Sequence, residues 1–345
     1  MQEQPRTTDG GATRSVGIVG VGFISEAMHI PTIQGFPDLS IRMLVDPFAD
    51  ERRMRDLSER VGCQWSRSVN DMCVDLAVIA TPISKHCEIG MALLEKDSHL
   101  LVEKPLGATH AECTTLLQAA DAKGRRVYCG QMRRFYKNVG IAKAAVAAGL
   151  IGDLESVSIF EGNLAISMRK FYDPNRQDIN PIDEGVFFDV GTHSIDSVVY
   201  VLEDLGGTFT MEDCVTDDLH LQSNVEVSGR IRLANGQDAA FHGAFSSSTG
   251  LANCIWFRGT RATLLLSVIP TVMPIIFPGC GGRPITLDSS GYSGDSPFVQ
   301  QYRAILASLD NGQDTAIDAR HMLETVKVLD SAWSLARVGT CRWMD

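Results

Sequence analysis

The chain has 345 residues, 44% of them hydrophobic, which is enough for one large domain or two. A formal net charge of −11 argues against a general binder of nucleic-acid backbones. Nine cysteines occur without a Cys-x-x-Cys pair, which favours a reduced, cytoplasmic protein over a disulfide framework or a zinc site. No apolar run approaches the roughly 20 residues of a membrane span, so we expect neither membrane nor nucleic-acid partners.

The first predicted elements form a nucleotide-binding turn. Residues 1–14 are polar and are expected to be a flexible tail. An apolar run over 16–19 suits a strand buried on both faces, and residues 23–36 can form the helix that follows. Between them, Gly20 permits a tight turn, and Gly22 lets the backbone approach a pyrophosphate at the helix N-terminus.

This turn is a variant of the Gly-x-Gly-x-x-Gly dinucleotide fingerprint, in which Ser25 replaces the third glycine. The alternative is an ordinary α/β turn that happens to contain glycines. The strand, the helix and a correctly spaced acid together favour dinucleotide binding. We expect the cofactor contacts of this turn to be Gly20, Gly22, Phe23 and Ile24.

The spaced acid is Asp46, which ends a second predicted strand over 40–45. A carboxylate at this position can bind the hydroxyl pair of a ribose and repels a 2′-phosphate, which predicts NAD as the cofactor. Arg52 and Arg53 follow a few residues later. NADP would also bind if these arginines folded back onto the site.

Strands and helices alternate through the rest of the first half. Strands are expected over 75–80, 99–102 and 126–129, and helices over 50–59, 84–96 and 109–123, with Ser84 as a helix cap. This alternation predicts a parallel, doubly wound sheet, the Rossmann α/β fold, in a dinucleotide-binding domain of residues 15–135. Open α/β sheets bind ligands at the carboxyl ends of their strands, where Thr81-Pro82 and Glu103-Lys104 lie.

The second half has the pattern of an antiparallel sheet. Asn235-Gly236 joins predicted strands over 225–233 and 238–245, and further strands are expected over 154–160, 253–257 and 262–267. Residues 298–309 and 319–336 are expected to be helical, and 270–294 irregular. The result is an α+β domain over 136–345 with a largely antiparallel sheet, whose terminal helices can pack back on the first domain.

A predicted helix over 186–202 is apolar nearly all round and therefore buried. Its polar residues recur at i+3 and i+4 spacing and so share one face: Asp189, His193, Asp196, Ser197 and Tyr200. They either satisfy one another in a core network or form the wall of a cleft between the domains. A metal site is disfavoured, because no third ligand lies near Asp189 and His193.

A polar segment, residues 162–183, precedes this helix. Most of it reads as an ordinary surface loop, but a loop entering a functional helix is well placed to select a substrate. We expect Arg169, Lys170 and Tyr172 to be the substrate contacts. Their basic character indicates an anionic or hydroxyl-rich small molecule.

Several motifs in order resemble the Gfo/Idh/MocA family, the nicotinamide-dependent oxidoreductases named for glucose–fructose oxidoreductase and inositol dehydrogenase. They are the glycine turn, Ala80-Thr81-Pro82 with His86, Glu103-Lys104-Pro105, Met132-Arg133-Arg134-Phe135, Leu150-Ile151-Gly152 and Asp189-x-Gly191-x-His193. The resemblance covers nearly the whole chain after the tail. It departs from the family pattern at Ser25 and at Ile83, where asparagine is common.

The resemblance implies roles for individual residues. Lys104 would lie near the nicotinamide and the substrate hydroxyl, and Asp189 and His193 would complete a catalytic set in the cleft. Further cofactor contacts would be Thr81, Pro82, His86, Glu103, Lys104, Gln131 and Arg134. The resemblance also implies a homo-oligomer, a dimer or tetramer formed through the exposed face of the second sheet.

The predicted function is hydride transfer between NAD, or NADP, and a secondary alcohol or ketone of a sugar, nucleotide sugar or cyclitol. His193 would be the general base for oxidation, Lys104 would stabilise negative charge on the same oxygen, and Asp189 would hold either partner. Proton relay by Lys104 itself is the mechanistic alternative. Two other functions stay open: a hydrolase or eliminase that uses transiently reduced NAD, and a non-catalytic dinucleotide-binding regulator.

Overall fold

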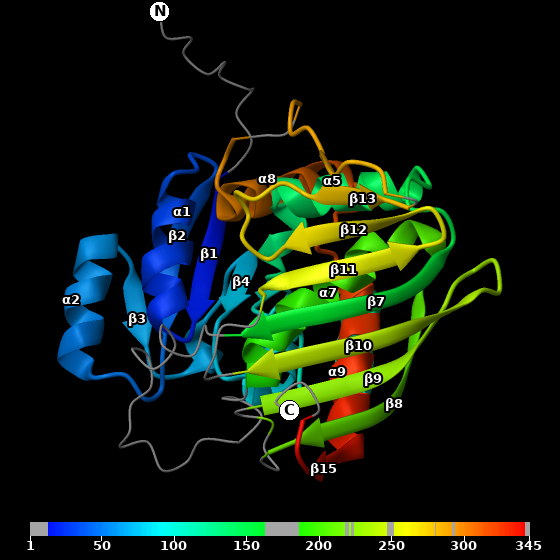
Figure 1. The fold of residues 1–345 in the computed structure, drawn as a ribbon. Helices are drawn as coiled ribbons and strands as arrows, with labels where there is room; N and C mark the ends of the chain where they lie inside the picture. The colour runs from blue at the N-terminus through cyan, green and yellow to red at the C-terminus, as the bar shows by residue number, and fades with distance from the viewer. Residues whose placement is uncertain are drawn as a thin grey trace, which may run out of the picture.

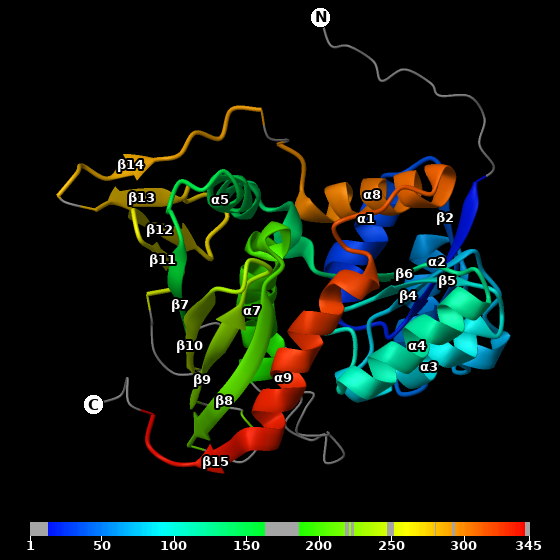
Figure 2. The ribbon, with the colours of Figure 1, turned by 90° about the vertical axis from the view of Figure 1, so that its right-hand side faces the viewer.

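The computed structural model describes residues 13–162, 186–217, 221, 224–246, 252–279, 281–291 and 294–341. Two β-sheets, one of six strands and one of nine, dominate this part of the chain. They lie side by side, with helices between them and on the far side of the smaller sheet (Figures 1 and 2). The predicted pairing of a parallel sheet with a largely antiparallel one is confirmed.

The six-stranded sheet is parallel throughout and has the order β3-β2-β1-β4-β5-β6. Its strands are β1 Arg14–Val19, β2 Leu39–Val45, β3 Gln64–Ser66, β4 Leu76–Ile79, β5 His99–Val102 and β6 Val127–Cys129. The strand order reverses between β1 and β4, and this switch point opens a crevice at the carboxyl ends of the strands. The short edge strand β3 was not predicted, because three residues carry too little of a pattern.

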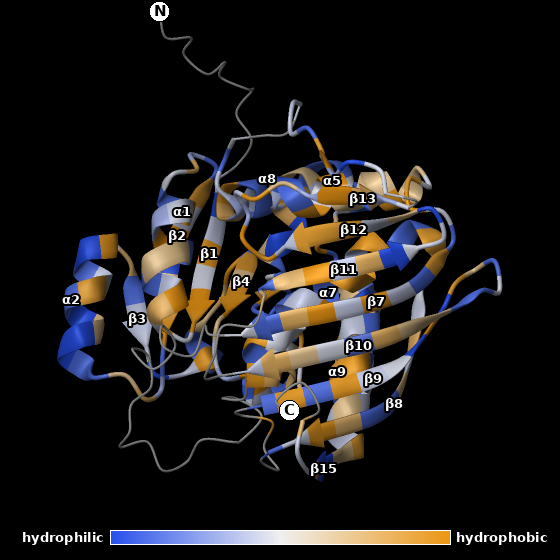
Figure 3. Ribbon diagram, in the orientation of Figure 1, coloured by the Kyte–Doolittle hydropathy of each residue, from blue (hydrophilic) through white to orange (hydrophobic). Residues whose placement is uncertain are grey.

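Helices cover both faces of this sheet, so β1 and β4 are mostly apolar (Figure 3). They are α1 Ile30–Gln34 after a wider turn η1 Ser25–His29, α2 Glu51–Val61, α3 His86–Leu94 and α4 His110–Ala122. Thr109 caps α4 in a capping box with Glu112. Ser84 does not cap α3: it lies inside a preceding 3₁₀ turn, η3 Ile83–Lys85, and Lys85 takes the cap position.

The nine-stranded sheet has the order β14-β13-β12-β11-β7-β10-β9-β8-β15. Its strands are β7 Leu154–Gly162, β8 Thr208–Thr216, β9 Asn224–Arg232, β10 Asp238–Ser246, β11 Cys254–Gly259, β12 Ala262–Ser267, β13 Ile275–Pro278, β14 Ile285–Thr286 and β15 Ala336–Val338. Two pairs, β7 with β10 and β8 with β15, are parallel, and the others are antiparallel. The expectation of an irregular segment over 270–294 is partly wrong, because β13 and β14 lie within it.

Three helices pack between the two sheets (Figure 2). They are α5 Lys137–Ala147, α7 Thr192–Val201 after a wider turn η6 Phe187–Gly191, and α9 Leu323–Leu335 after a 3₁₀ turn η8 Ala319–Met322. A further helix, α8 Pro297–Asn311, contributes Tyr302, Ile305 and Leu306 to the core cluster that contains β1. The C-terminal part of the chain therefore packs into the core of the first sheet. The domain boundary near residue 135 stays a prediction.

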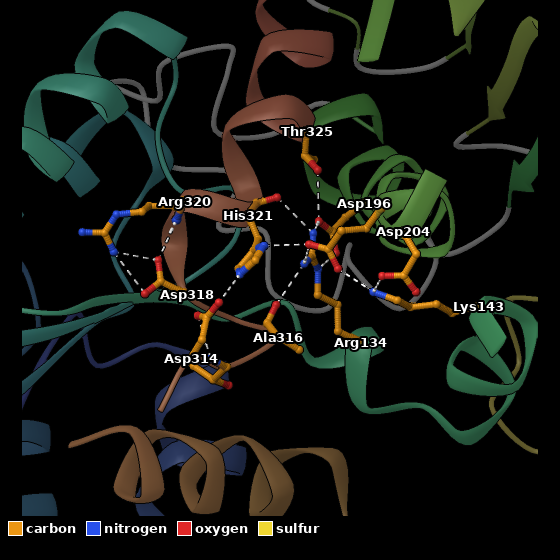
Figure 4. Close-up of polar contacts among 12 residues, drawn as sticks. Arg134, Lys143, Asp196, Asp204, Asp314, Ala316, Asp318, Arg320, His321 and Thr325 are labelled. Carbon is orange, nitrogen blue, oxygen red and sulfur yellow. Dashed lines mark hydrogen bonds and ion pairs between the residues drawn. The ribbon is translucent and has the colours of Figure 1, made fainter. Parts of the chain in front are cut away.

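A buried ion pair joins helix α7 to the first sheet (Figure 4). Arg134, in the turn η4 Met132–Phe135 after β6, donates to both carboxylate oxygens of Asp196 at 2.9 and 2.8 Å. The same guanidinium donates to the main-chain oxygens of Ala316 and His321, and Thr325 donates to Asp196 at 3.0 Å. Neither charged side chain has exposed surface, so each depends on the other for its charge to be tolerated.

His321 adds an ion-paired rim to this network (Figure 4). Its Nδ1 lies 2.6 Å from Glu203 and its Nε2 lies 3.2 Å from Asp314, contacts that raise the pKa of His321 above its usual value. Burial raises the pKa of Glu203, but hydrogen bonds from His321 and Lys143 outweigh it and hold that pKa at about 2. The end of α7 is thereby tied to the segment that follows α8.

We expect Asp196→Ala to lower the free energy of unfolding by roughly 3–5 kcal/mol, because it leaves the Arg134 charge buried without its partner. Urea unfolding followed by circular dichroism measures this change. Asp204→Ala is the matched control, since Asp204 is a half-exposed carboxylate on the rim, 3.5 Å from Lys143. Equal stability losses in the two variants would contradict the importance given to the buried pair.

Candidate active site

The glycine turn after β1 forms a cradle at the carboxyl ends of the strands. Gly20 has a φ of +86°, and a Cβ there would lie 2.4 Å from the Ala80 oxygen, so no other residue fits. Gly22 is exposed, and a Cβ added there would meet no atom within 4 Å. Ser25 donates to the Gly20 oxygen at 2.6 Å and closes the turn. Open backbone ahead of a helix N-terminus fits a dinucleotide pyrophosphate.

The side chains beside this cradle are partly exposed. Phe23 is 55% exposed, and Ile24 is half-buried. Thr81 is half-buried and Pro82 is exposed in the loop after β4. Phe23 and Ile24 begin the helical segment after the glycine turn, and Thr81 and Pro82 lie in the loop after β4, so all four follow the carboxyl ends of strands β1 and β4.

The Asp46 carboxylate accepts hydrogen bonds from the main chain of the glycine turn and of the loop after β2. One carboxylate oxygen accepts from the Val21 N–H at 3.0 Å, and the other accepts from the N–H groups of Phe48 and Ala49. Arg53 does fold back onto the turn: it donates to the Val21 oxygen at 2.6 Å and also pairs with Glu26. Asp46 and Arg53, the two residues from which the sequence predicts the choice between NAD and NADP, therefore both contact Val21.

Three of the predicted cofactor contacts, His86, Glu103 and Gln131, are buried near the strand ends. His86 lies with its ring nitrogens 2.9 Å from the oxygens of Thr81 and Pro105, so it links the loops after β4 and β5. Glu103 is also buried, and its carboxylate accepts from the Lys104 N–H at 3.1 Å. Gln131 is buried too, and its side-chain oxygen has no hydrogen-bond partner within the described ranges.

Lys104 and Asp189 meet from opposite sheets. Lys104 follows β5 of the first sheet, whereas Asp189 lies in η6, at the start of the helix that packs on the second. The Lys104 ammonium donates to the Asp189 main-chain oxygen at 3.0 Å and forms an ion pair with its carboxylate. Both side chains keep some exposure, 18% and 23%.

His193 lies one turn further along the same helix. It is half-buried, and its Nδ1 has no hydrogen-bond partner among the residues that the structure describes. Burial, together with the nearby charges of Arg133 and Lys104, holds the pKa of His193 well below its usual value. The imidazole is therefore neutral at neutral pH and able to accept a proton.

Sequence reasoning missed the charge that lies beside His193. Arg133 donates to Glu161 at 2.7 Å and to the Ser194 hydroxyl at 3.3 Å, and all three residues are buried. The motif containing Arg133 was noted, but not its partner. The signal was Glu161 itself, an acid at an inward position of β7 beyond Val157 and Ile159.

The polar residues of η6 and α7 divide between two surroundings. Asp189 and His193 lie at the Lys104 end. Asp196 pairs with Arg134 in the buried network. The Arg134 guanidinium also lies 4.9 Å from the centre of the Tyr200 ring. Ser197 donates to the main-chain oxygen of His193 at 2.8 Å. The side chain of the predicted cofactor contact Arg134 has no exposed surface, because it lies in the buried pair with Asp196.

The predicted substrate contacts Arg169, Lys170 and Tyr172 lie outside the described residues. Within the described ranges, no three His, Cys, Asp or Glu side chains are grouped to hold a metal ion. In the same part of the chain, no helix has both the length and the apolar character needed to cross a bilayer.

Among curated proteins, similarity is found to inositol dehydrogenases. The chain is 24% identical over 254 residues to the scyllo-inositol 2-dehydrogenase (NADP(+)) IolW of Bacillus subtilis, covering 68% of each chain. It is 35% identical over 148 residues to inositol 2-dehydrogenase 1 of Saccharopolyspora erythraea, covering 41% of this chain and 43% of the other. The chain thus spans about two thirds of the first relative and less than half of the second.

Solved structures share the fold over nearly the whole chain. The aldose-aldose oxidoreductase of Caulobacter crescentus has a TM-score of 0.76 at 16% identity, covering 93% of this chain and 96% of the other. KijD10, a 3-ketoreductase of Actinomadura kijaniata solved with NADP and TDP-benzene, has a TM-score of 0.75 at 18% identity, covering 94% and 98%. At these identities the likeness establishes the fold alone.

Two family models match consecutive parts of the chain. The oxidoreductase family model with an NAD-binding Rossmann fold matches residues 14–131. The GFO/IDH/MocA C-terminal domain matches residues 140–265. The chain therefore belongs to the Gfo/Idh/MocA family of NAD(P)-dependent oxidoreductases.

Proposed function

We propose that the protein transfers a hydride between a nicotinamide dinucleotide and a secondary alcohol or ketone of a sugar, nucleotide sugar or cyclitol. The observation that carries this proposal is the meeting of Lys104 with Asp189 beside the neutral ring of His193, at the carboxyl edge of the Rossmann sheet. A nicotinamide bound there supplies the hydride chemistry. The names of the inositol dehydrogenases that the chain resembles support a polyol substrate.

His193, Lys104 and Asp189 have different roles in the proposed reaction. His193, neutral at neutral pH, accepts the hydroxyl proton as the alcohol is oxidised. The Lys104 ammonium donates a hydrogen bond to the same oxygen and stabilises its developing negative charge, while Asp189 holds the ammonium in place. In the reverse direction, the lowered pKa of His193 makes it a stronger acid once it is protonated. Lys104 as the proton relay remains the alternative assignment.

The predicted site contacts are part of this proposal. The proposed dinucleotide contacts follow the carboxyl ends of β1, β2 and β4, and they are Gly20, Gly22, Phe23, Ile24, Asp46, Thr81 and Pro82. His86 and Glu103 support the same loops from behind. Arg169, Lys170 and Tyr172 remain candidate substrate contacts from the sequence alone.

His193→Ala should lower kcat by roughly 10²–10⁴-fold, the usual contribution of a positioned acid–base group. Lys104→Ala should be comparably severe, and the double variant should cost much less than the product of the two single losses. A panel of cyclitols, sugars and nucleotide sugars, assayed by NADH absorbance with both cofactors, provides the substrate for these measurements.

The matched control is His99→Ala, at the opposite end of β5 from Lys104. It should keep kcat, and His193→Ala should bind NADH largely as the unchanged protein does, because the glycine turn and Asp46 are untouched. Near-full activity of His193→Ala would remove His193 from the mechanism. Failure of the whole panel to change NADH absorbance would contradict the proposed function.

The pH dependence of oxidation follows from the state of His193. Since its pKa is held below the usual 6.5 by burial, Arg133 and Lys104, kcat/KM should stay level as the pH falls through 6.5 and decline only at lower pH. Initial rates across the acid range, at saturating cofactor, measure the profile. A decline centred at or above pH 6.5 would show that a group with an ordinary imidazole pKa controls the step.

We expect NAD to be preferred to NADP. Asp46 places a carboxylate at Val21, and Arg53, which has folded back to that point, is paired with Glu26. Glu26→Gln frees the guanidinium and should improve NADPH affinity relative to NADH by roughly tenfold, the value of a charged hydrogen bond. Adding Arg53→Ala should cancel the gain. Fluorescence titration measures both affinities, and tighter binding of NADPH by the unchanged protein would overturn this preference.

We propose that two copies of the chain contact each other through the outer face of the nine-stranded sheet. In Figure 1, no described helix or strand covers this face. Trp256, Leu265 and Ile275 are cross-strand partners on that face, and Phe277 lies 5.8 Å from the Trp256 ring. An identical apolar stripe on each copy suits a two-fold interface. Light scattering should give a dimer or tetramer, which Leu265→Lys should dissociate; a monomeric unchanged protein would contradict this.

A further inference from the structure

A chain of three buried polar side chains lies directly behind Lys104. The His29 Nδ1 is 2.9 Å from the Tyr302 hydroxyl, and the His29 Nε2 is 3.1 Å from Glu103. The other Glu103 oxygen accepts from the Lys104 N–H at 3.1 Å. His29 and Tyr302 are completely buried, and Glu103 is 7% exposed. The three come from η1, from α8 and from the loop after β5.

We assign one direction to the hydrogen bonds of this chain, with the His29 proton on Nε2. Burial, and secondarily the Glu103 charge, raise the pKa of Tyr302 well above its usual value, so its hydroxyl keeps its proton and donates to the His29 Nδ1. The Nε2–H then donates to Glu103. Burial raises the pKa of Glu103, but His29 and Lys104 outweigh it, so that its pKa lies below the usual value and Glu103 is a carboxylate. Every polar atom is thereby satisfied.

Close packing fixes the three side chains in place. The rings of Phe298 and Tyr302 lie edge-on to the His29 ring, at 5.6 and 6.0 Å with interplanar angles of 84°. On the other side, Gly130 leaves room for Glu103: a Cβ there would lie 2.6 Å from a carboxylate oxygen. The Glu103 carboxylate is held by His29 on one oxygen and by the Lys104 N–H on the other, so it has little room to move.

We propose that His29 and Tyr302 are positioning residues that act through Glu103 to fix the strand end from which Lys104 projects, with the Glu103 carboxylate held against the main chain of that lysine. Glu103 accepts from the peptide N–H of Lys104 itself, so any shift of the carboxylate moves the lysine main chain. This inference rests on the proposed role of Lys104 in hydride transfer. It links α8, nearly 200 residues away in sequence, to the catalytic edge.

The first test compares matched substitutions. Tyr302→Phe and His29→Gln should lower kcat by roughly 10- to 100-fold, the cost of a misplaced catalytic group, with the NADH dissociation constant unchanged. Tyr128→Phe, in a fully buried tyrosine of the same core cluster, and His99→Gln, at the other end of β5, should keep kcat. A loss of melting temperature with unchanged kcat in Tyr302→Phe would show a purely structural role and overturn the proposal.

The second test needs no substrate, so it stands even if the proposed function fails. Cyanate carbamoylates only neutral amines, and the extent of reaction at Lys104 can be followed by peptide mass spectrometry at a fixed pH. Glu103→Gln keeps the side-chain volume and the acceptor for the Lys104 N–H but removes the charge. It should speed carbamoylation of Lys104 by roughly threefold to tenfold, because a nearby carboxylate favours the charged ammonium.

Tyr302→Phe and His29→Gln should also speed this reaction, by loosening Glu103, whereas Tyr128→Phe should not. Lys143, which pairs with Glu203 and Asp204 elsewhere, serves as the internal reference in every sample. Equal Lys104 rates in all variants would overturn the proposal. Faster labelling in a protein that turns over no substrate would uphold the proposed positioning and refute the function alone.

Discussion

The ion pair between Lys104 and Asp189 is the contact on which the site depends, because its two members belong to different sheets. Lys104 follows β5 of the first sheet, and Asp189 reaches it from η6, the turn that leads into α7. The buried pair of Arg134 and Asp196 sets that position, by anchoring the same helix one to two turns further on. Asp196, in the buried pair, and Asp189, in the pair with Lys104, thus lie along one continuous stretch of η6 and α7 and are separated along its length.

The distribution of buried charge explains how a neutral histidine is maintained beside two cations. Arg133 is held by Glu161, and Lys104 by Asp189, so each cation is compensated by its own carboxylate. His193 has no carboxylate among its described contacts, and burial therefore dominates its pKa. A neutral imidazole can accept a proton from an alcohol, whereas an imidazolium has no free nitrogen lone pair and cannot.

Much of the fold followed from local pattern, and the departures have physical reasons. Buried parallel strands such as β4 and β5 are apolar runs, and the β9–β10 hairpin carries its Asn-Gly turn, so both were predicted. The strand β8 mixes apolar and charged residues, and β13 and β14 lie among prolines and glycines, so periodicity did not reveal them.

The residues of the candidate site were harder to predict from the sequence than the fold. Asp189 and His193 stood out as polar residues on an apolar helix, but Arg134 looked like a ligand contact because its partner Asp196 is visible only in three dimensions. The contact between His29 and Tyr302 joins residues 273 apart in sequence, and no local pattern indicates it.

The central claim is that Lys104 and His193 act on one substrate oxygen at the carboxyl edge of the Rossmann sheet. A crystal structure of the protein with NADH and a non-reacting analogue of the substrate found by the panel tests it most directly. The account predicts one analogue oxygen within hydrogen-bond distance of both the Lys104 ammonium and the His193 ring, facing the nicotinamide. An analogue bound elsewhere, or a His193 ring turned into the core away from it, would contradict the account.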